Sequence, residues 1–400
     1  MPGFGQTHLR DTAILLEKHE LLDSIILPLN IALKEGSQLR KIPIVNRAAN
    51  RNHGLPRSKV NTLFLGDLIY QFGFWVHRKV SPKLGIYLEA LGFMAYSNSS
   101  ARKIRRKNPS LKLIVRAGFA GKIRKKVNNP IICDVSLVHP QHLESLIETG
   151  EFSNKMEKGL SPVERLIAQD IEESEFILAN CEFVKESLVR IGVPEQKIFV
   201  AYLEPEKIFQ IHANRILDSP RTRSNYILFA GTLEKRKGIE ELCSLSQYLI
   251  SRHPEVELHL VGNWMPSGQE FKERLSKMEN VQIFSWMSWE QLVEKIYSAL
   301  VFVFPTRAEG SARVIMESMY LGVPVITTLN SGSVIRHAES GIIVPSNKVE
   351  SLNYAVSDLI LNYDYSENLG KRGRDQVSKM ILRGEYFAQL SVLLDVVFKC

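Results

Sequence analysis

One stretch in the C-terminal third of the chain constrains the fold more than any other: residues 301–324, VFVFPTRAEGSARVIMESMYLGVP. The four apolar residues from Val301 to Phe304 have the length of a buried strand, and Pro305 ends it. After a short polar loop, apolar residues recur with a helical period from about Ser311. A strand, a tight loop and a helix in this order build ligand sites in α/β proteins, because the carboxyl end of the strand faces the helix N-terminus.

Two carboxylates lie in this stretch, eight residues apart. Glu309 falls in the loop and Glu317 about two turns into the helix, so both can border one pocket. Glu317 stands among apolar residues of its helix, which makes a solvated position hard to explain. Since a buried carboxylate without polar partners is costly, we expect both side chains to meet a polar ligand.

The rest of the chain repeats the alternation of strand and helix, which predicts parallel sheets covered on both faces. Four hundred residues are too many for one ordinary core. We therefore predict an α/β fold of two Rossmann-like, doubly wound domains facing each other across a cleft. The predicted parts are an N-terminal domain (1–203), a linker rich in proline and polar residues (204–225), a C-terminal domain (226–384) and a final helix that packs back on the first domain (385–400).

Hydrophobic periodicity places the individual elements. In the second domain we predict strands at 226–230, 256–261, 281–284, 301–304, 323–327 and 342–344, and helices at 240–252, 270–278, 290–298, 349–371 and 386–398. In the first we predict strands at 24–33, 42–45, 60–66, 111–115, 131–133, 175–179 and 197–201, and helices at 84–106, 161–174 and 181–192.

The N-terminus begins with a glycine-containing turn that includes Gly3 and Gly5, and a helical pattern follows. Such glycines let a backbone approach a phosphate or sugar closely, although a flexible terminus explains them equally well. In a doubly wound domain this turn follows a central first strand, and here no strand precedes it. Either the chain starts too late, or another segment fills that place.

A second loop carries three consecutive cations between two glycines, at residues 231–238, GTLEKRKG. It follows a predicted strand, so Arg236 and Lys237 could clamp a phosphate, while the alternative is a solvated basic turn. Both loops end parallel strands of one domain and are expected to converge at one crevice. A diphosphate would fit there against the helix start at Ser311, Ala312 and Arg313, with Glu317 accepting hydrogen bonds from ribose and Glu309 from the sugar.

The formal net charge of +8 has a local origin. Residues 102–126 contain eleven basic and no acidic residues, which leaves the rest of the chain slightly acidic. Three interpretations remain open: a solvated surface, an anionic acceptor or nucleic acid, and an anionic membrane face. No nucleic-acid motif accompanies the run, and we expect peripheral attachment to the cytoplasmic leaflet, since each cation near such a surface contributes about 1 kcal/mol.

Other composition features favour a cytoplasmic protein. Four scattered cysteines form neither a disulfide framework nor a metal pair, the N-terminus lacks a secretory signal, and no apolar run has the length of a membrane helix. The aromatics of residues 67–80 are predicted to be core or interface side chains rather than a membrane-contacting surface.

At this point the sequence resembles a known family. Glu309 and Glu317, preceded by VFVFPTRAEG and followed by LGVPVI, resemble the signature of glycosyltransferase family 4, the retaining GT-B enzymes. Gly231 to Gly238 resembles that family's donor-phosphate loop, residues 257–262 (ELHLVG) its next strand, and residues 179–198 the last unit of its N-terminal domain. The resemblance covers roughly residues 160–380 well and the first 150 residues weakly.

The resemblance implies roles for single residues. Glu317 would bind the nucleotide ribose, Glu309 the donor sugar, and Lys237 with Arg236 the diphosphate. His139, after the strand at 131–133, would face the reacting sugar, and the loop of Gly3 and Gly5 would face the donor. Two positions depart from the family: Thr232 stands where an arginine is common, so Arg236 would be its substitute, and Arg313 would add a cation beside the phosphates.

The implied activity is transfer of a sugar from a nucleotide-diphosphate sugar to a glycan or lipid-linked acceptor, with retention at the anomeric carbon. The chain contains no Asp-x-Asp motif, so we expect neither a metal nor another cofactor, and fixed cations would stabilise the leaving diphosphate. The alternatives are a catalytically inactive binding or scaffold protein of the same fold and a Rossmann oxidoreductase. The second is disfavoured because Gly3 and Gly5 lack a preceding strand and a third glycine.

Overall fold

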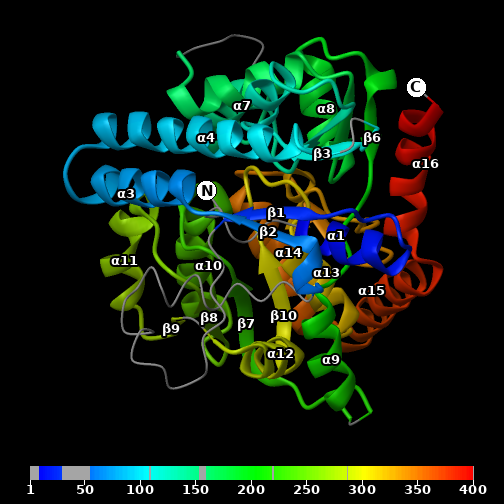
Figure 1. The fold of residues 1–400 in the computed structure, drawn as a ribbon. Coiled ribbons are helices and arrows are strands. Elements are labelled where there is room, and N and C mark those ends of the chain that lie inside the picture. Colours follow the sequence, from blue (N-terminus) through cyan, green and yellow to red (C-terminus); the bar gives the residue numbers. More distant parts are fainter. Residues whose placement is uncertain are drawn as a thin grey trace, which may run out of the picture. The chain divides into compact units, whose positions relative to one another are not determined.

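The computed structural model describes residues 9–28, 55–107, 110–152, 159–218, 220–285 and 287–399. Contacts divide the chain into two compact units. The first comprises residues 1–135, 157–178 and 393–400, and the second comprises residues 136–156 and 179–392. Each unit is described by itself below, and Figure 1 shows the elements of both.

The second unit is built on a six-stranded sheet of order β12-β11-β10-β7-β8-β9, whose neighbouring strands all pair in parallel. The carboxyl ends of the strands therefore lie at one edge, with β10 and β7 at the centre. The strands are β7 (Ser224–Ala230), β8 (Glu257–Val261), β9 (Val281–Phe284), β10 (Ala299–Phe304), β11 (Val325–Thr328) and β12 (Ile342–Val344).

Helices connect and cover these strands, as parallel crossovers require. Capping follows the sequence: Ser288 closes a capping box with Gln291 at the start of α12. The helices of this unit are α6 (Pro140–Thr149), α8 (Glu182–Arg190), α9 (Lys207–Ile216), α10 (Ile239–Arg252), α11 (Gln269–Ser276), α12 (Trp289–Tyr297), α13 (Arg313–Tyr320), α14 (Val349–Leu361), α15 (Tyr363–Arg383) and α16 (Glu385–Lys399) up to Val392.

The core of this unit lies on the central strands. Phe302 and Phe304 of β10 and Phe229 of β7 are buried to within 1% of their surface, and the rings of Phe229 and Phe304 stack with centroids 5.5 Å apart. A run of apolar residues without alternation is what a strand covered on both faces needs. This packing fixes the ends of β7 and β10, from which the two predicted site loops emerge.

The first unit contains two sets of parallel strands. β1 (Ile25–Pro28) pairs with β2 (Val60–Leu63), and β3 (Leu113–Arg116) pairs with β4 (Ile131–Val135) in a sheet of order β3-β4-β5-β6, with β5 at Phe176–Ala179. The last strand of this order, β6 (Ile198–Val200), falls within the residue range of the second unit. Its helices are α1 (Leu9–Lys18), α3 (Leu65–Lys79), α4 (Pro82–Ile104), α5 (Ala120–Arg124) and α7 (Pro162–Glu172).

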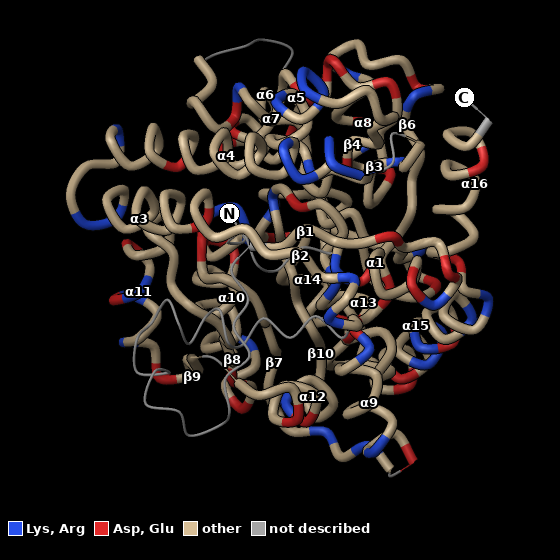
Figure 2. The backbone as a smooth tube through the Cα atoms, viewed as in Figure 1, with Lys and Arg blue, Asp and Glu red and all other residues tan. Residues whose placement is uncertain are grey.

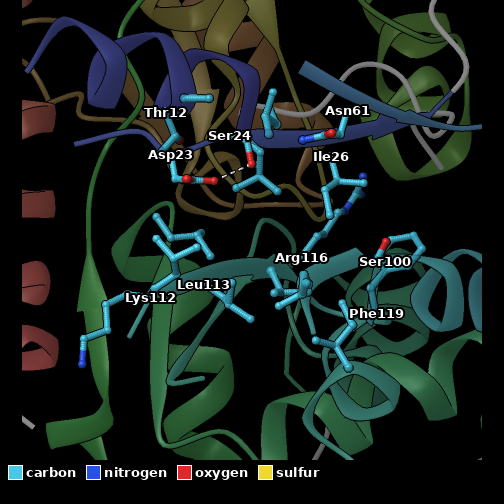
Figure 3. A pocket seen from close by; sticks show the side chains of 18 of the residues that line it. Thr12, Asp23, Ser24, Ile26, Asn61, Ser100, Lys112, Leu113, Arg116 and Phe119 are labelled. Carbon is cyan, nitrogen blue, oxygen red and sulfur yellow. Dashed lines mark hydrogen bonds between the residues drawn. The ribbon is translucent and has the colours of Figure 1, made fainter. Parts of the chain in front are cut away.

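A cavity of about 370 Å³ separates β1 from β3. Residues of both strands line it, and Figure 3 shows Ile26 of β1 across from Leu113 and Arg116 of β3. Among the described strands, β1 pairs only with β2, and β3 only with β4. In a doubly wound sheet of order 3-2-1-4-5-6 a central strand would occupy the position between two such edges, and the absence of a first strand from this domain stays a prediction.

The predicted strands and helices of residues 224–344 are confirmed with small shifts at their ends. Two predictions need correction. Residues 349–371 form two helices, α14 and the start of α15, separated at Asn362. Residues 204–225, predicted as a linker, contain α9, because Phe209 and Ala213 are buried in the core of the second unit. The predicted strand at 42–45 lies outside the described residues.

The aromatic segment at 67–80 is also only partly as predicted. Tyr70 is buried and packs edge-on against Phe93. Phe72 and Trp75, by contrast, keep more than half of their surface exposed, so a core position is wrong for them, while an interface position stays a prediction. No helix in the described part of the chain has both the length and the apolar character needed to cross a bilayer.

Candidate functional site

The cation loop (residues 231–238), which follows β7, packs closely against the residue that follows β10. Lys235–Lys237 form a single 3-10 turn, and Gly238 ends it with a φ of +81°, in the left-handed region. A Cβ atom at Gly238 would lie 2.2 Å from the carbonyl oxygen of Pro305, which no side chain tolerates. Glycine therefore lets the cation loop approach the loop that carries Glu309.

Glu309 is the anion of a buried charge cluster. Its Oε1 lies 2.7 Å from Arg236 Nη1 and 2.8 Å from Lys237 Nζ. Arg236 also donates to Glu234 Oε1 at 2.9 Å and to the carbonyl of Ala308 at 2.8 Å, which fixes the plane of the guanidinium. The two loops predicted to converge therefore do so, and the residues that join them are those with predicted roles.

The cluster holds Glu309 ionised. Burial alone would raise the pKa of its carboxyl, but the adjacent charges of Arg236 and Lys237 outweigh this and lower it to about 2. In turn, the carboxylate raises the pKa of Arg236 against the effect of burial. Without a ligand, Arg236 is thus paired with both Glu309 and Glu234, while Lys237 is paired with Glu309.

The backbone at Glu309 is held from the neighbouring loop after β11. The amide of Glu309 donates to the carbonyl of Asn330 at 2.9 Å. The side chain of Asn330 donates to the carbonyls of Arg307 and Gly150, each at 2.8 Å. Arg307 itself is buried and pairs with Glu241 at 2.7 Å. These polar side chains tie the loop that carries Glu309 to α10 and to the end of α6.

Gly310 is the point at which the segment after β4 contacts this loop. A Cβ atom there would lie 2.1 Å from the carbonyl oxygen of Ser136 and 2.6 Å from Asn180 Nδ2. Asn180 in turn donates to the Ser136 carbonyl at 3.2 Å. The segment that leads to His139 therefore lies against Glu309 and Gly310 within the same unit.

His139 occupies the position before α6 and is fully buried. Its Nδ1 accepts from the amide of Gln141 at 3.3 Å, and its backbone amide donates to Ser187 Oγ at 3.0 Å. Among the described residues Nε2 has no hydrogen-bond partner. Burial, with a smaller effect of His142, lowers the pKa of His139 to about 4, so the ring is neutral at physiological pH.

Two further polar atoms beside Gly310 are buried without a partner in the described structure: Ser311 Oγ and Asn180 Oδ1. Buried polar atoms are ordinarily hydrogen-bonded, so these two atoms, together with His139 Nε2 elsewhere in the same unit, are the pattern expected of a polar ligand site. At the helix start the amide of Ala312 donates to the carbonyl of Ser331 at 3.1 Å, and this N–H group is therefore already engaged.

Glu317 lies on α13 with 4% of its surface exposed. Burial raises the pKa of its carboxyl to about 7, while the nearby Arg313 opposes this rise. Arg313 pairs with Glu206 at 3.0 Å, and the backbone amide of Glu206 hydrogen-bonds Glu317. Glu317 is thus buried and titrates near neutrality, which a partner offering two hydroxyl groups would change.

Most of the predicted site residues belong to one region of the second unit. Gly231 starts the cation loop, and its backbone lies so close to Gly262 that a Cβ at Gly262 would be 1.8 Å from its carbonyl oxygen. Gly3 and Gly5 lie outside the described residues. The sequence reasoning missed Asn180, Asn330, Arg307 and Glu206; of these, only Arg307, a charged residue between a buried strand and Glu309, carried a signal that could have been noticed.

The fold defines the class of protein: an α/β protein of the GT-B type. Superposition on solved structures supports this assignment over the whole chain. The Anabaena protein HepE, solved in complex with UDP and glucose, matches with a TM-score of 0.63 at 11% identity, covering 99% of this chain and 97% of its own. At this identity the likeness shows the fold alone.

Sequence comparison is more specific over part of the chain. Residues 215–376, which include both site loops, match the family "Glycosyl transferases group 1". The capsular polysaccharide biosynthesis glycosyltransferase CapM of Staphylococcus aureus is 28% identical over 178 residues, 42% of this chain and 46% of its own length. An uncharacterized glycosyltransferase of Methanocaldococcus jannaschii is 23% identical over 262 residues, 62% of this chain and 65% of its own. The matches therefore span less than two thirds of either relative.

Proposed function

We propose that the protein transfers a sugar from a nucleotide-diphosphate sugar to a glycan or lipid-linked acceptor, with retention of the anomeric configuration. The observation that carries this proposal is the cluster of Glu309, Arg236 and Lys237, which lies beside buried polar atoms without partners. The cluster falls within the segment that matches glycosyl transferases group 1. Polysaccharide assembly is the process named for the relative in Staphylococcus aureus, and it supports a glycan acceptor.

In this proposal the two cations, Arg236 and Lys237, stabilise the leaving diphosphate. As the bond to the anomeric carbon breaks, negative charge builds on the diphosphate. Lys237 and Arg236 are fixed by Glu309, Glu234 and the Ala308 carbonyl before any ligand arrives, so little reorganisation is needed when that charge develops. Prearranged charges of this kind are the largest single contribution in many enzymes. In this mechanism the chain's own cations stabilise the leaving diphosphate, and no metal or other cofactor is proposed.

Glu317 binds the nucleotide ribose in this proposal. Its carboxylate is buried among apolar residues, where two ribose hydroxyls would replace the hydration that it lacks. Glu309 faces the donor sugar, with its charge kept negative by the two cations beside it. His139 is neutral and its Nδ1 accepts from the Gln141 amide, so its proton lies on Nε2, which has no partner in the described structure and donates a hydrogen bond to the sugar or acceptor.

We also propose that the protein acts at the cytoplasmic leaflet of a membrane, held there by cations of residues 102–126. Arg102, Arg105, Arg106 and Lys125 are exposed and support this placement. Other members of the run have protein partners: Lys107 contacts Asp23, and Arg124 pairs with Glu173 at 3.3 Å. Only the exposed cations of this run are therefore proposed to contact an anionic surface.

A donor panel tests the activity. Purified protein is incubated with uridine-, guanosine- and adenosine-diphosphate sugars and with glycan or polyprenyl-phosphate-linked acceptors, and the released nucleoside diphosphate is measured. Release with at least one donor, lost in Glu317→Ala, is expected. The coupling constant of the product's anomeric proton then reports the stereochemistry: an inverted product would overturn retention, and no release from any donor would overturn transfer itself.

A further inference from the structure

The hairpin of α3 and α4 in the first unit carries an apolar stripe on its outer side. The two helices lie antiparallel and side by side (Figure 1), joined by a short turn. On each helix the exposed apolar residues follow helical spacing and so share one face. This outer face consists of Leu65, Leu68, Phe72 and Trp75 of α3, Val80 of the turn, and Leu84, Tyr87 and Leu91 of α4, each 37–63% exposed.

The inner faces of the two helices meet through glycines. Gly66 and Gly73 of α3 and Gly85 and Gly92 of α4 are each spaced by seven residues. A Cβ atom at Gly85 would lie 2.3 Å from the backbone of His77, and one at Gly92 would lie 2.7 Å from the backbone of Tyr70. The helices are therefore in backbone contact, and no larger residue fits between them.

This arrangement reverses the usual pattern of a hairpin in water, in which large apolar residues fill the contact and polar residues face outwards. Small residues in the contact and large apolar residues outside are typical of helix pairs in a lipid environment, where close backbone packing replaces the hydrophobic effect between helices. The surface is too long and too continuous to be scattered apolar residues of an ordinary exterior.

The charges of the hairpin are all of one sign where they are exposed. Asp67 and Glu89 are the only acidic residues in 65–104, and both are buried, Glu89 beside His77 at 3.1 Å. The ends of the two helices next to the turn expose Arg78, Lys79 and Lys83, and Figure 2 shows basic segments where α3 and α4 are joined. An apolar face bordered only by cations matches a bilayer surface with anionic headgroups better than it matches another protein face.

From these observations we propose that the outer face of the α3–α4 hairpin binds the interface of an anionic phospholipid bilayer. Both helices lie in the plane of the interface, with Phe72, Trp75 and Tyr87 among the headgroups and acyl chain ends, and with Arg78, Lys79 and Lys83 at the phosphates. Aromatic side chains with one polar edge favour this depth. The inference extends the proposed membrane attachment: it adds an apolar contact to the cations of residues 102–126.

Vesicle binding tests the inference without using sugar transfer, so its failure is distinct from failure of the proposed activity. The full chain is sedimented with phosphatidylcholine vesicles that contain 30% phosphatidylglycerol, and with vesicles of phosphatidylcholine alone. We expect binding to the anionic vesicles and about tenfold weaker binding for Phe72→Ser/Trp75→Ser. The matched control is Tyr354→Ser/Leu361→Ser, which removes two exposed apolar side chains of α14 and is expected to bind as wild type does.

A second measurement reports the position of the hairpin directly. Trp75 is the only tryptophan of the first 260 residues, so brominated lipids should quench part of the fluorescence in wild type and less in Trp75→Phe. Absence of binding at low salt would overturn the inference. Binding that is lost on neutralising Arg105 and Arg106 but is unchanged in Phe72→Ser/Trp75→Ser would also overturn it. A dimer in solution that this double variant dissociates, without vesicle binding by wild type, would assign the face to a second copy and overturn it as well.

Discussion

The carboxylate of Glu309 lies 2.8 Å from Lys237 Nζ, and this ion pair joins the loops that follow the two central strands of the second unit. Arg236 completes the cluster from the other side at 2.7 Å. The pair has two consequences: Glu309 is ionised at every pH at which the protein is expected to be folded, and the cations are in place before a donor binds.

Replacing Glu309 with glutamine should separate binding from transfer. The variant leaves Lys237 without its anion and Arg236 paired with Glu234 alone, so we expect the affinity for a nucleoside diphosphate to be equal to or higher than that of wild type. Sugar transfer should fall by about 100-fold or more, the size of effect seen when one fixed electrostatic contact is removed from a catalytic site. Calorimetric titration and a transfer assay check the two parts, and weaker diphosphate binding would contradict the assignment.

The same variant should change the acid sensitivity of the fold. The pKa of Glu309 is lowered to about 2 from an ordinary value of 4.5. Its ionised form therefore stabilises the folded state above pH 4.5, and this contribution is lost as the pH falls towards 2. In Glu309→Gln that part of the acid dependence should be absent, as thermal unfolding between pH 3 and 6 would show.

The raised pKa of Glu317 predicts that the stability of the fold depends on pH with the opposite sign. Its pKa is raised to about 7 in the folded protein, so the folded state binds more protons than the unfolded state between pH 4.5 and 7. Stability should fall as the pH rises through this window, by at most about 3 kcal/mol. Glu317→Gln should remove this fall. Donor affinity in wild type should rise over the same range, because ribose hydroxyls bind the ionised carboxylate.

Neutralising Lys237 should weaken diphosphate binding. The Lys237→Met variant loses one charge-assisted contact, for which we expect about 10- to 100-fold lower affinity, or about 1.5–3 kcal/mol. The matched control is Lys235→Met in the same turn. Lys235 pairs with Glu270 at 2.6 Å and stays 42% exposed, so its loss should change affinity less than threefold. Equal effects in the two variants would show that only the net charge of the loop matters.

Gly310→Ala tests the contact between the Glu309 loop and the segment of His139. The added methyl group would meet the carbonyl of Ser136 at 2.1 Å, so the loops must separate. We expect a lower melting temperature and a loss of transfer activity. Gly159→Ala is the control, because nothing lies within 4 Å of the added Cβ there, and it should behave as wild type. Unchanged activity in Gly310→Ala would show that the contact does not position Glu309.

The sequence alone was sufficient to predict those features of the site that depend on strand order. Apolar runs of four or more residues marked the central strands, and parallel pairing then required that the loops after Ala230 and Phe304 meet at one edge. The ion pairs of Glu309 with Arg236 and Lys237 were not predicted, since the sequence analysis assigned Glu309 to the sugar and the two cations to the diphosphate. Asn330 and Asn180 could not be anticipated, because polar residues that hold loops through carbonyl groups carry no periodic signal.

The first unit was less predictable for a physical reason. Periodicity shows which residues share a face of a helix, but not whether that face is the buried one. In α3 the glycines take the inner face, and Phe72 and Trp75 are consequently exposed, contrary to the prediction from their hydrophobicity.

The most direct test of the central claim is calorimetric titration of a panel of nucleotide-diphosphate sugars into wild type and Glu317→Ala at pH 8. We expect at least one donor to bind wild type at micromolar concentration, and the same donor to bind Glu317→Ala about tenfold or more weakly. Binding of no donor by wild type, or equal binding by both proteins, would contradict the assignment of residues 215–376 as a nucleotide-sugar site.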